Sequence, residues 1–302
     1  MKVLEVRSVS KSYSHHKALD DVSISVPEGQ IFGLLGPNGA GKTSLIRIIN
    51  QITMPDQGDI LFKGNSLSSE HIKTIGYLPE ERGLYKKMKV GEQALYLAQL
   101  KGLSKAEAKI ALKEWFEKFD IAPWWNKTIE DLSKGMAQKV QFITTVLHRP
   151  KLLIFDEPFS GFDPINANVI KDEIINLKEQ GTSIIFSTHR MDSVEEICDH
   201  IALIDKSKKI LDGPIQQIKK NFKQQIYTVD FSSSNLDFLN TLTEPFKLIN
   251  KNNHQADIQI LNQTPASDLI RFLLDKSDIK AFKEKIPTIN EIFIRTIQEN
   301  ES

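Results

Sequence analysis

The sequence predicts an α/β fold followed by a small α+β domain, and two observations support this. In residues 1–215, short apolar runs alternate with longer segments of helical periodicity, as expected of a sheet covered by helices. From residue 226 onward, the pattern changes to short strands interspersed with brief helices. A chain of 302 residues is long enough for one large domain and one small domain.

The composition excludes several classes of protein. With 40% apolar and 26% charged residues, the chain differs from collagen-like, low-complexity and wholly disordered sequences. Lys plus Arg and Asp plus Glu each number 39, so the zero net charge gives no overall attraction to nucleic acid, and no nucleic-acid partner is expected. The single Cys198 excludes an internal disulfide and a multi-cysteine metal site.

The apolar runs are too short to cross a membrane. The longest of them, such as residues 152–155, are far below the ~18 residues that a spanning helix needs. Glu5 interrupts the N-terminal segment before the apolar core of a secretory signal develops. A cytoplasmic location is therefore expected.

The first domain is predicted to span residues 1–215. Its clearest core strands are residues 31–35, 151–155 and 183–187. Helical spacing of apolar residues over 90–101 and 104–119 predicts an inserted helical lobe at about 86–148. Pro123 stops this helical pattern, and the tryptophans that follow it, Trp124 and Trp125, are interpreted as packing anchors.

Pro214 is predicted to open a short helix, and a polar linker at 216–225 leads to a C-terminal domain predicted to span residues 226–302. The expected strands are 227–231, 246–249, 256–261 and 279–282, and the expected helices are 236–242, 266–275 and 289–297. This order suggests a ferredoxin-like α+β unit. We interpret it as a stabilising or dimer-contacting appendage rather than a ligand sensor, because it carries no clear cluster of polar residues.

A glycine-rich loop joins the strand at 31–35 to an amphipathic segment. Its residues are Gly36, Pro37, Asn38, Gly39, Ala40, Gly41, Lys42 and Thr43, and Ser44 opens the segment that follows. Strand, loop and helix in this order are typical of a phosphate-binding P-loop. Glycines let backbone N–H groups surround a phosphate, the lysine neutralises the β- and γ-phosphates, and the threonine hydroxyl binds Mg²⁺. P-loops occur in kinases, GTPases and helicases, so this motif predicts a nucleotide site without naming the reaction.

Two acidic residues follow the strand at 151–155. Asp156, at the carboxyl edge of the sheet, can hold Mg²⁺, and Glu157 can act as the base that polarises the attacking water. Such a pair is also common among solvated loop carboxylates. The P-loop upstream favours the catalytic interpretation.

Residues 132–138, Leu-Ser-Lys-Gly-Met-Ala-Gln, resemble the signature of ATP-binding cassette (ABC) ATPases. They lie between the P-loop and the acidic pair, as in that family. The resemblance implies that Ser133 and Gly135 contact the γ-phosphate bound by a second chain in a head-to-tail dimer. Ser133 is also a candidate N-cap for the helix that follows, and we expect both roles.

Further motifs in the same order extend the resemblance over residues 13–189. Tyr13 matches the aromatic residue that stacks on adenine, Asp163 belongs to a segment similar to the D-loop, and His189 resembles the switch histidine that senses the γ-phosphate. The other six histidines, including His15 and His16, are interpreted as polar loop residues.

Two positions depart from the family pattern. The signature carries Lys134 and Met136 where many members have Gly and Gln, and the Q-loop position carries Glu80 instead of Gln. A carboxylate at residue 80 retains an oxygen able to reach Mg²⁺, but it adds negative charge beside the triphosphate. We expect the coupling role of the Q-loop to persist and leave its metal contact open.

The resemblance implies an ATPase subunit that uses ATP and Mg²⁺ and drives a membrane permease encoded on a separate chain. The variant signature and the segment at 77–85 resemble the bacterial branch that exports sodium and drugs. The resemblance further implies a homodimer or pseudo-dimer, with the homodimer expected, held at the inner face of the membrane through the permease. The transported substrate is not predicted, because selectivity would reside in the permease.

Two alternatives remain at this stage. A soluble ABC-type ATPase acting on ribosomes or nucleic acid is one, but such relatives usually carry two cassettes or long coiled coils, which this sequence lacks. A nucleotide-regulated binding module without turnover is the other, and it conflicts with the set Asp156, Glu157 and His189.

Overall fold

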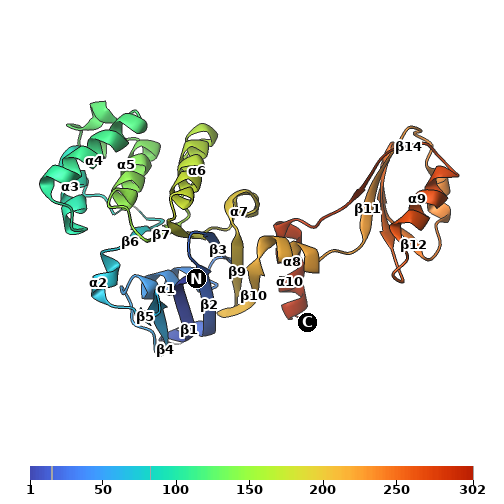
Figure 1. The fold of residues 1–302 in the computed structure, drawn as a ribbon, viewed down its shortest axis with the longest axis horizontal. Coiled ribbons are helices and arrows are strands. Elements are labelled where there is room, and N and C mark those ends of the chain that lie inside the picture. The colour runs from blue at the N-terminus through green and yellow to red at the C-terminus, as the bar shows by residue number, and fades with distance from the viewer. Residues whose placement is uncertain (15, 82, 302) are drawn as a thin grey trace. The chain divides into compact units, whose positions relative to one another are not determined.

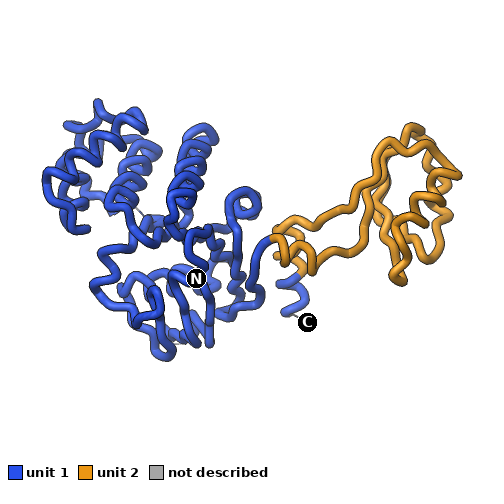
Figure 2. Tube along the Cα trace, in the orientation of Figure 1, with its two compact units in different colours: residues 1–215, 296–302 blue, residues 216–295 orange. Residues whose placement is uncertain are grey.

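The computed structural model describes residues 1–14, 16–81 and 83–301 and divides into two compact units. Figure 2 colours the first unit, residues 1–215 with 296–302, and the second unit, residues 216–295. His15, interpreted above as a loop residue, lies outside the described residues.

The first unit is built on a sheet with the strand order β10-β9-β3-β8-β7-β6 (Figure 1). The strands are β10 (Lys208–Pro214), β9 (His200–Asp205), β3 (Ile31–Leu35), β8 (Ser183–Ser187), β7 (Leu152–Asp156) and β6 (Ile75–Leu78). All neighbours from β9 to β6 pair in parallel, and β10 pairs antiparallel with β9. Every residue of β3, β7 and β8 is buried, as expected of central strands covered on both faces.

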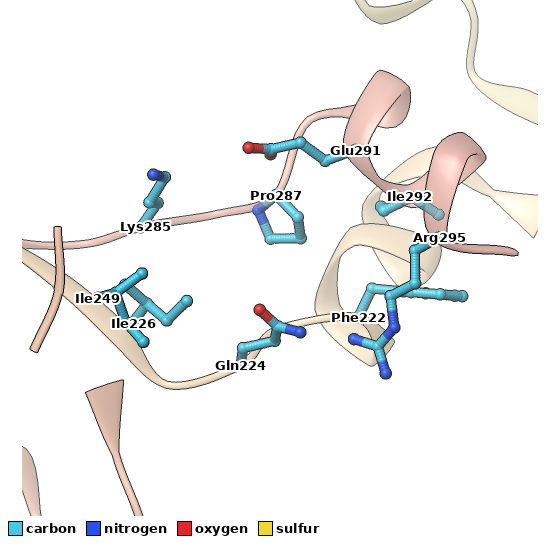
Figure 3. Close-up of a pocket in the computed structure, with 9 residues that line it drawn as sticks. All are labelled: Phe222, Gln224, Ile226, Ile249, Lys285, Pro287, Glu291, Ile292 and Arg295. Atoms are coloured by element: carbon cyan, nitrogen blue, oxygen red, sulfur yellow. The ribbon is translucent and has the colours of Figure 1, made fainter. Parts of the chain in front are cut away.

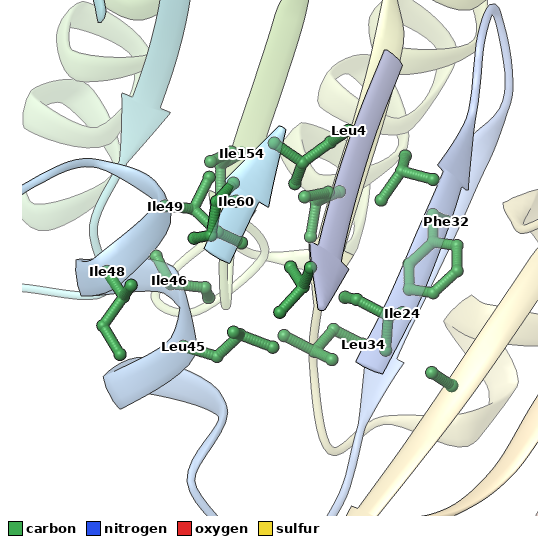
Figure 4. Close-up of a cluster of buried hydrophobic side chains, with 14 of the residues drawn as sticks. Leu4, Ile24, Phe32, Leu34, Leu45, Ile46, Ile48, Ile49, Ile60 and Ile154 are labelled. Carbon is green, nitrogen blue, oxygen red and sulfur yellow. The ribbon is translucent and has the colours of Figure 1, made fainter. Parts of the chain in front are cut away.

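A second, antiparallel sheet in this unit has the order β2-β1-β4-β5. It consists of β1 (Lys2–Tyr13), β2 (His16–Pro27), β4 (Gln57–Phe62) and β5 (Asn65–Ser66). The apolar face of α1 (Lys42–Ile49) joins a core that includes Leu4 and Ile60 of this sheet and Ile154 of the parallel sheet (Figure 4). Burial of this face fixes α1, and with it the loop that precedes it.

The helical lobe consists of α3 (Val90–Leu100), α4 (Lys105–Lys118), η1 (Ala122–Trp124), η2 (Ile129–Asp131) and α5 (Lys134–Val146). Ser104 opens α4 with a capping box: its side chain accepts from the backbone N–H of Glu107, and its backbone N–H donates to the Glu107 carboxylate. The ring of Phe142 in α5 stacks on Phe155 in β7, with 5.6 Å between ring centroids. The lobe is therefore packed directly on the strand that ends in Asp156.

The remaining helices of the first unit are α2 (Ser69–Ile72), α6 (Pro164–Glu179) and α7 (Met191–Ile197). Short α2 precedes β6, and α6 joins β7 to β8. Such a helix between two parallel strands is the usual crossover connection.

The second unit has a sheet in the order β12-β13-β11-β14, with every neighbouring pair antiparallel. Its elements are β11 (Ile226–Phe231), η3 (Asp237–Thr241), β12 (Phe246–Lys251), β13 (Gln255–Ile260), α9 (Ala266–Leu274), β14 (Ile279–Glu284) and α10 (Ile289–Glu301), which begins in this unit. This strand order is that of the ferredoxin-like fold, so the predicted fold class is confirmed. Phe231, Ile258 and Leu269 are fully buried in its own core.

Two local predictions can be compared with the structure, and the first needs correction. The predicted helix at 236–242 is the shorter 3-10 helix η3, in which the N–H groups of Leu239 and Leu242 donate to carbonyl oxygens three residues back. The short helix expected after Pro214 is present as α8 (Ile215–Asn221), and it covers most of the predicted linker at 216–225. Ile215 and Ile218 are both buried, and this apolar spacing stabilises the helix.

Trp125 has the anchoring role that the sequence suggested. Its ring packs edge-on against Phe116, with 5.5 Å between centroids. A Cβ atom placed on Gly91, in the first turn of α3, would lie 2.3 Å from Cε2 of this ring. Only glycine lets α3 approach the indole so closely.

We therefore expect Gly91→Ala to destabilise the protein by about 1–3 kcal/mol, because the added methyl group overpacks the contact with Trp125. Thermal unfolding followed by tryptophan fluorescence measures the effect. Gln99→Ala, at an exposed position of the same helix, is the matched control and should leave the midpoint within about a degree. Equal midpoints for both variants would contradict this packing argument.

Candidate functional site

The loop between β3 and α1 requires glycine at two positions. Gly36 has φ +148°, and a Cβ atom there would lie 2.1 Å from the carbonyl oxygen of Ile204 in β9. Gly41 has φ +114°, and its Cβ atom would lie 2.3 Å from the carbonyl oxygen of Ala18 in β2. The loop is thus held tightly against two neighbouring strands, with a backbone that other residues adopt only at a cost.

Lys42, the first residue of α1, is buried and points back into the loop. Its Nζ donates to the carbonyl oxygens of Gly36 at 2.7 Å and Pro37 at 3.1 Å. Burial lowers the pKa of this ammonium below its ordinary value, and nearby carboxylates, Glu157 foremost, oppose the shift. The ammonium of Lys42 is therefore held at the loop, where an anionic ligand can replace the two carbonyl oxygens as its hydrogen-bond acceptor.

Glu157 follows β7 in a left-handed conformation, with φ +50°. This backbone conformation is uncommon for residues other than glycine and persists only where neighbouring contacts enforce it. The backbone N–H of Glu157 donates to the carbonyl oxygen of Ser187 in β8 at 2.9 Å. The turn is thereby tied to the next strand of the sheet.

The carboxylate of Glu157 is held by the residues that follow β8. Its Oε1 accepts from the backbone N–H of His189 at 2.9 Å and lies 2.7 Å from Nδ1 of the same residue. Its Oε2 accepts from Oγ1 of Thr188 at 3.1 Å. The His189 side chain is 62% exposed and Glu157 only 11%, so the ring lies on the solvent side of the carboxylate.

Asp156 is buried at the carboxyl end of β7. Burial raises its pKa above the ordinary value, and the charges of Glu80 and Glu157 add to the rise. The carboxylates outnumber the single ammonium of Lys42, so the site has an excess of negative charge that a bound cation would relieve.

One cavity of about 280 Å³ brings most of the predicted site residues together. It is lined by Tyr13, His16, Ala18, Asn38, Gly39, Gly41, Lys42, Thr43, Ser44, Glu80, Asp156, Glu157 and His189. Gly36, Pro37 and Ala40 belong to the same loop but are not among the lining residues. The loop, the acidic pair and the histidine thus come from three neighbouring strands and face one space.

Ser133, Gly135 and Asp163 do not line this cavity. Ser133 is exposed and caps α5, with its Oγ accepting from the backbone N–H of Met136 at 3.3 Å. Asp163 caps α6 by accepting from the backbone N–H groups of Ile165 and Asn166, each at 3.1 Å. The predicted N-cap at Ser133 is present.

Sequence reasoning missed three residues at the site. His16 and Ala18 line the cavity from β2, and Thr188 contacts Glu157. His16 pairs directly with Tyr13 across the turn between β1 and β2. The hairpin spacing around Tyr13 could have predicted that His16 lies beside it. The contact of Thr188 with Glu157 could not be predicted in this way, because it depends on the pairing of β7 with β8.

A groove of about 430 Å³ lies beside Glu80, between the helical lobe and the parallel sheet. Its lining is mainly apolar and includes Tyr77, Pro79, Leu84, Leu97 and Leu100. Leu100 is 60% exposed. An exposed apolar lining of this kind is typical of a protein contact surface.

The second unit has a cavity of its own, of about 280 Å³ (Figure 3). Its walls include Ile226, Ile249 and Pro287. Polar side chains at its edge have other partners: Lys285 donates to Asp257 at 2.8 Å, and Glu291 accepts from the backbone N–H of Thr288. The polar groups at this cavity are therefore less available to a ligand than those at the P-loop cavity.

Within residues 1–14, 16–81 and 83–301, no helix combines the length and apolar character needed to span a bilayer. The same residues contain no cluster of three or more His, Cys, Asp or Glu side chains arranged to hold a metal ion. A Mg²⁺ ion that uses one or two carboxylates together with substrate phosphates needs no such cluster.

Comparisons with known proteins agree with this geometry. A family model described as ABC transporter matches residues 19–160, and one described as the C-terminal domain of DrrA1-3-like ATP-binding proteins matches residues 213–297. The chain is 42% identical over 295 residues to the uncharacterised ABC transporter ATP-binding protein YhaQ of Bacillus subtilis, covering 98% of each chain.

A second relative is the linearmycin resistance ATP-binding protein LnrL of Bacillus subtilis, 34% identical over 70% of this chain and 69% of its own. A solved structure described as the ATP-binding subunit of an ABC transporter aligns with a TM-score of 0.68 and 31% identity, over 73% of this chain and 93% of that one. The chain therefore belongs to the ATP-binding proteins of ABC transporters, a family whose ATP-binding domain hydrolyses ATP.

Proposed function

We propose that this chain binds Mg-ATP in the P-loop cavity and that its hydrolysis there drives a permease on a separate chain. The observation that carries the proposal is the shared cavity of Lys42, Thr43, Asp156, Glu157 and His189. In it, the loop would hold the phosphates, Glu157 would act as the general base, and His189 would contact the γ-phosphate. Tyr13, at the edge of the cavity, would stack on the adenine.

The residues of this cavity fit Mg²⁺. Thr43 offers a hydroxyl and Asp156 a carboxylate, and the excess of negative charge there favours a cation. Glu80 lines the same cavity and could supply a further oxygen. The ion would neutralise phosphate charge, while Asp156 and Thr43 would orient the triphosphate towards Glu157.

We propose that a second copy of the chain completes the site. Ser133, at the start of α5, is exposed, and Gly135 is partly buried. Neither residue lines the cavity of its own chain. A helix N-terminus attracts anions, so these residues would contact the γ-phosphate held by the other copy. Asp163, at the start of α6, would lie at the same dimer interface.

The groove beside Glu80 would receive a cytosolic segment of the permease, placing the chain at the inner face of the membrane. Its apolar lining suits a packed helix. Pro79 lines the groove and the next residue, Glu80, lines the ATP cavity, so the two spaces are adjacent along the chain. Export is the proposed direction, supported by the similarity to LnrL, which is named for linearmycin resistance. Within this assembly we assign the cassette to residues 1–215 and an appended domain to the C-terminal part.

Lys42→Ala should weaken ATP binding by about 1.5–3 kcal/mol, roughly 10- to 150-fold in Kd, because a charge-assisted contact to the phosphates is lost. Titration calorimetry with Mg-ATP measures this change. The control is Lys63→Ala, which removes a surface lysine paired with Glu28 at 2.9 Å and should bind normally. An unchanged Kd for Lys42→Ala would contradict the assignment of the P-loop.

Glu157→Gln should lower kcat by about 10²–10⁴-fold while ATP binding persists, because the amide cannot accept the proton of the attacking water. The variant should also accumulate as an ATP-bound dimer in size-exclusion chromatography with Mg-ATP. Glu179→Gln, at an exposed position in α6, is the matched control. Hydrolysis by Glu157→Gln at close to the wild-type rate would show that another group is the base.

A cross-linker attached at Leu100→Cys should capture a membrane protein with several spanning segments, because Leu100 lines the proposed docking groove. The only native cysteine, Cys198, is buried, which makes labelling specific. Ile110→Cys is the control, because Ile110 is 64% exposed on α4 and does not line the groove. Consistent capture of ribosomal protein or nucleic acid at Leu100 would refute the transport role.

A further inference from the structure

Thr188 lies between the last residue of β8 and His189, and its side chain is almost completely enclosed, with the residue 1% exposed. Its Oγ1 accepts from the backbone N–H of Arg190 at 3.1 Å. Because a hydroxyl has a single proton, this bond leaves the proton free to point towards Oε2 of Glu157, 3.1 Å away. The hydroxyl is therefore oriented from one side and donates on the other.

We propose that Thr188 is a positioning residue that fixes the carboxylate of Glu157 for the hydrolysis of ATP. This inference rests on the proposed role of Glu157 as the base. A glutamate side chain has several rotatable bonds, and a base must be held within a fraction of an ångström of its productive position. The hydroxyl of Thr188 supplies such a restraint from a buried position directly after the neighbouring strand, β8.

The two oxygens of Glu157 are held in different ways. His189 contacts Oε1 both through its backbone N–H and through Nδ1, whereas Thr188 holds Oε2. If the exposed ring of His189 turns to the γ-phosphate, its contact with Oε1 is lost. The backbone N–H and the Thr188 hydroxyl then remain, one on each oxygen, and keep the plane of the carboxylate fixed.

The test compares Thr188→Val, which replaces the hydroxyl by a methyl group, with Thr188→Ser, which keeps the hydroxyl. For Thr188→Val we expect kcat to fall about 10- to 100-fold, with KM and the Kd for Mg-ATP changed less than about 2-fold. Thr188→Ser should regain most of kcat. Thr74→Val is the matched control, because Oγ1 of Thr74 donates only to a backbone carbonyl, that of His71, at 2.8 Å.

A double variant isolates the coupling. Because the hydroxyl acts through the carboxylate, Thr188→Val should cause no further loss in a Glu157→Gln background. The midpoint of thermal unfolding, compared with that of the wild type, shows whether each variant is folded and stable. If Thr188→Val is unstable, Thr188→Ala replaces it in the same comparison.

The outcomes separate this inference from the function on which it rests. If Glu157→Gln hydrolyses ATP at the wild-type rate, both the base assignment and the positioning role are wrong. If Glu157→Gln is inactive but Thr188→Val keeps the wild-type kcat, only the positioning role is wrong. The positioning role is also overturned if Thr188→Ser is as impaired as Thr188→Val, or if the loss lies in KM alone.

Discussion

Parallel pairing of β3 with β8, and of β8 with β7, brings the carboxyl ends of three strands side by side. The P-loop follows the first, Thr188 and His189 follow the second, and the acidic pair ends the third. An antiparallel neighbour would present its amino end at this edge, and its functional residues would lie at the far side of the sheet. The direction of the strands therefore brings together groups that are far apart along the chain, from Lys42 to His189.

Charge at this edge is arranged around one buried ammonium. Burial disfavours the charged forms of both Lys42 and Asp156. It therefore lowers the pKa of Lys42 and raises the pKa of Asp156. Lys42 donates to two loop carbonyls in this structure, so two of its protons are bound without a carboxylate. A phosphate entering the loop can accept those same protons, so the loop does not need to be rebuilt around its ligand.

The parts of this architecture that the sequence predicted are those with local signals. Glycines mark the loop, a buried apolar run precedes Asp156, and a Ser at the start of a helical pattern predicts the cap of α5. Thr188 has no local signal for its contact, because the hydrogen bond to Glu157 exists only once β7 and β8 pair. The short helix after Pro214 also had a local signal, the proline itself, and α8 continues because Ile215 and Ile218 are buried.

The start of α5, in the signature segment, is capped within its own chain but still has backbone N–H groups available for a ligand. Ser133 caps α5 through the N–H of Met136, but the geometry of an α-helix leaves the N–H groups of Lys134 and Gly135 without intrahelical partners. A Cβ atom on Gly135 would have no neighbour closer than 3.9 Å, so glycine is not required there by packing within the chain. In the proposed dimer, a small residue at this helix start would let a phosphate bound by the second copy approach the free N–H groups closely.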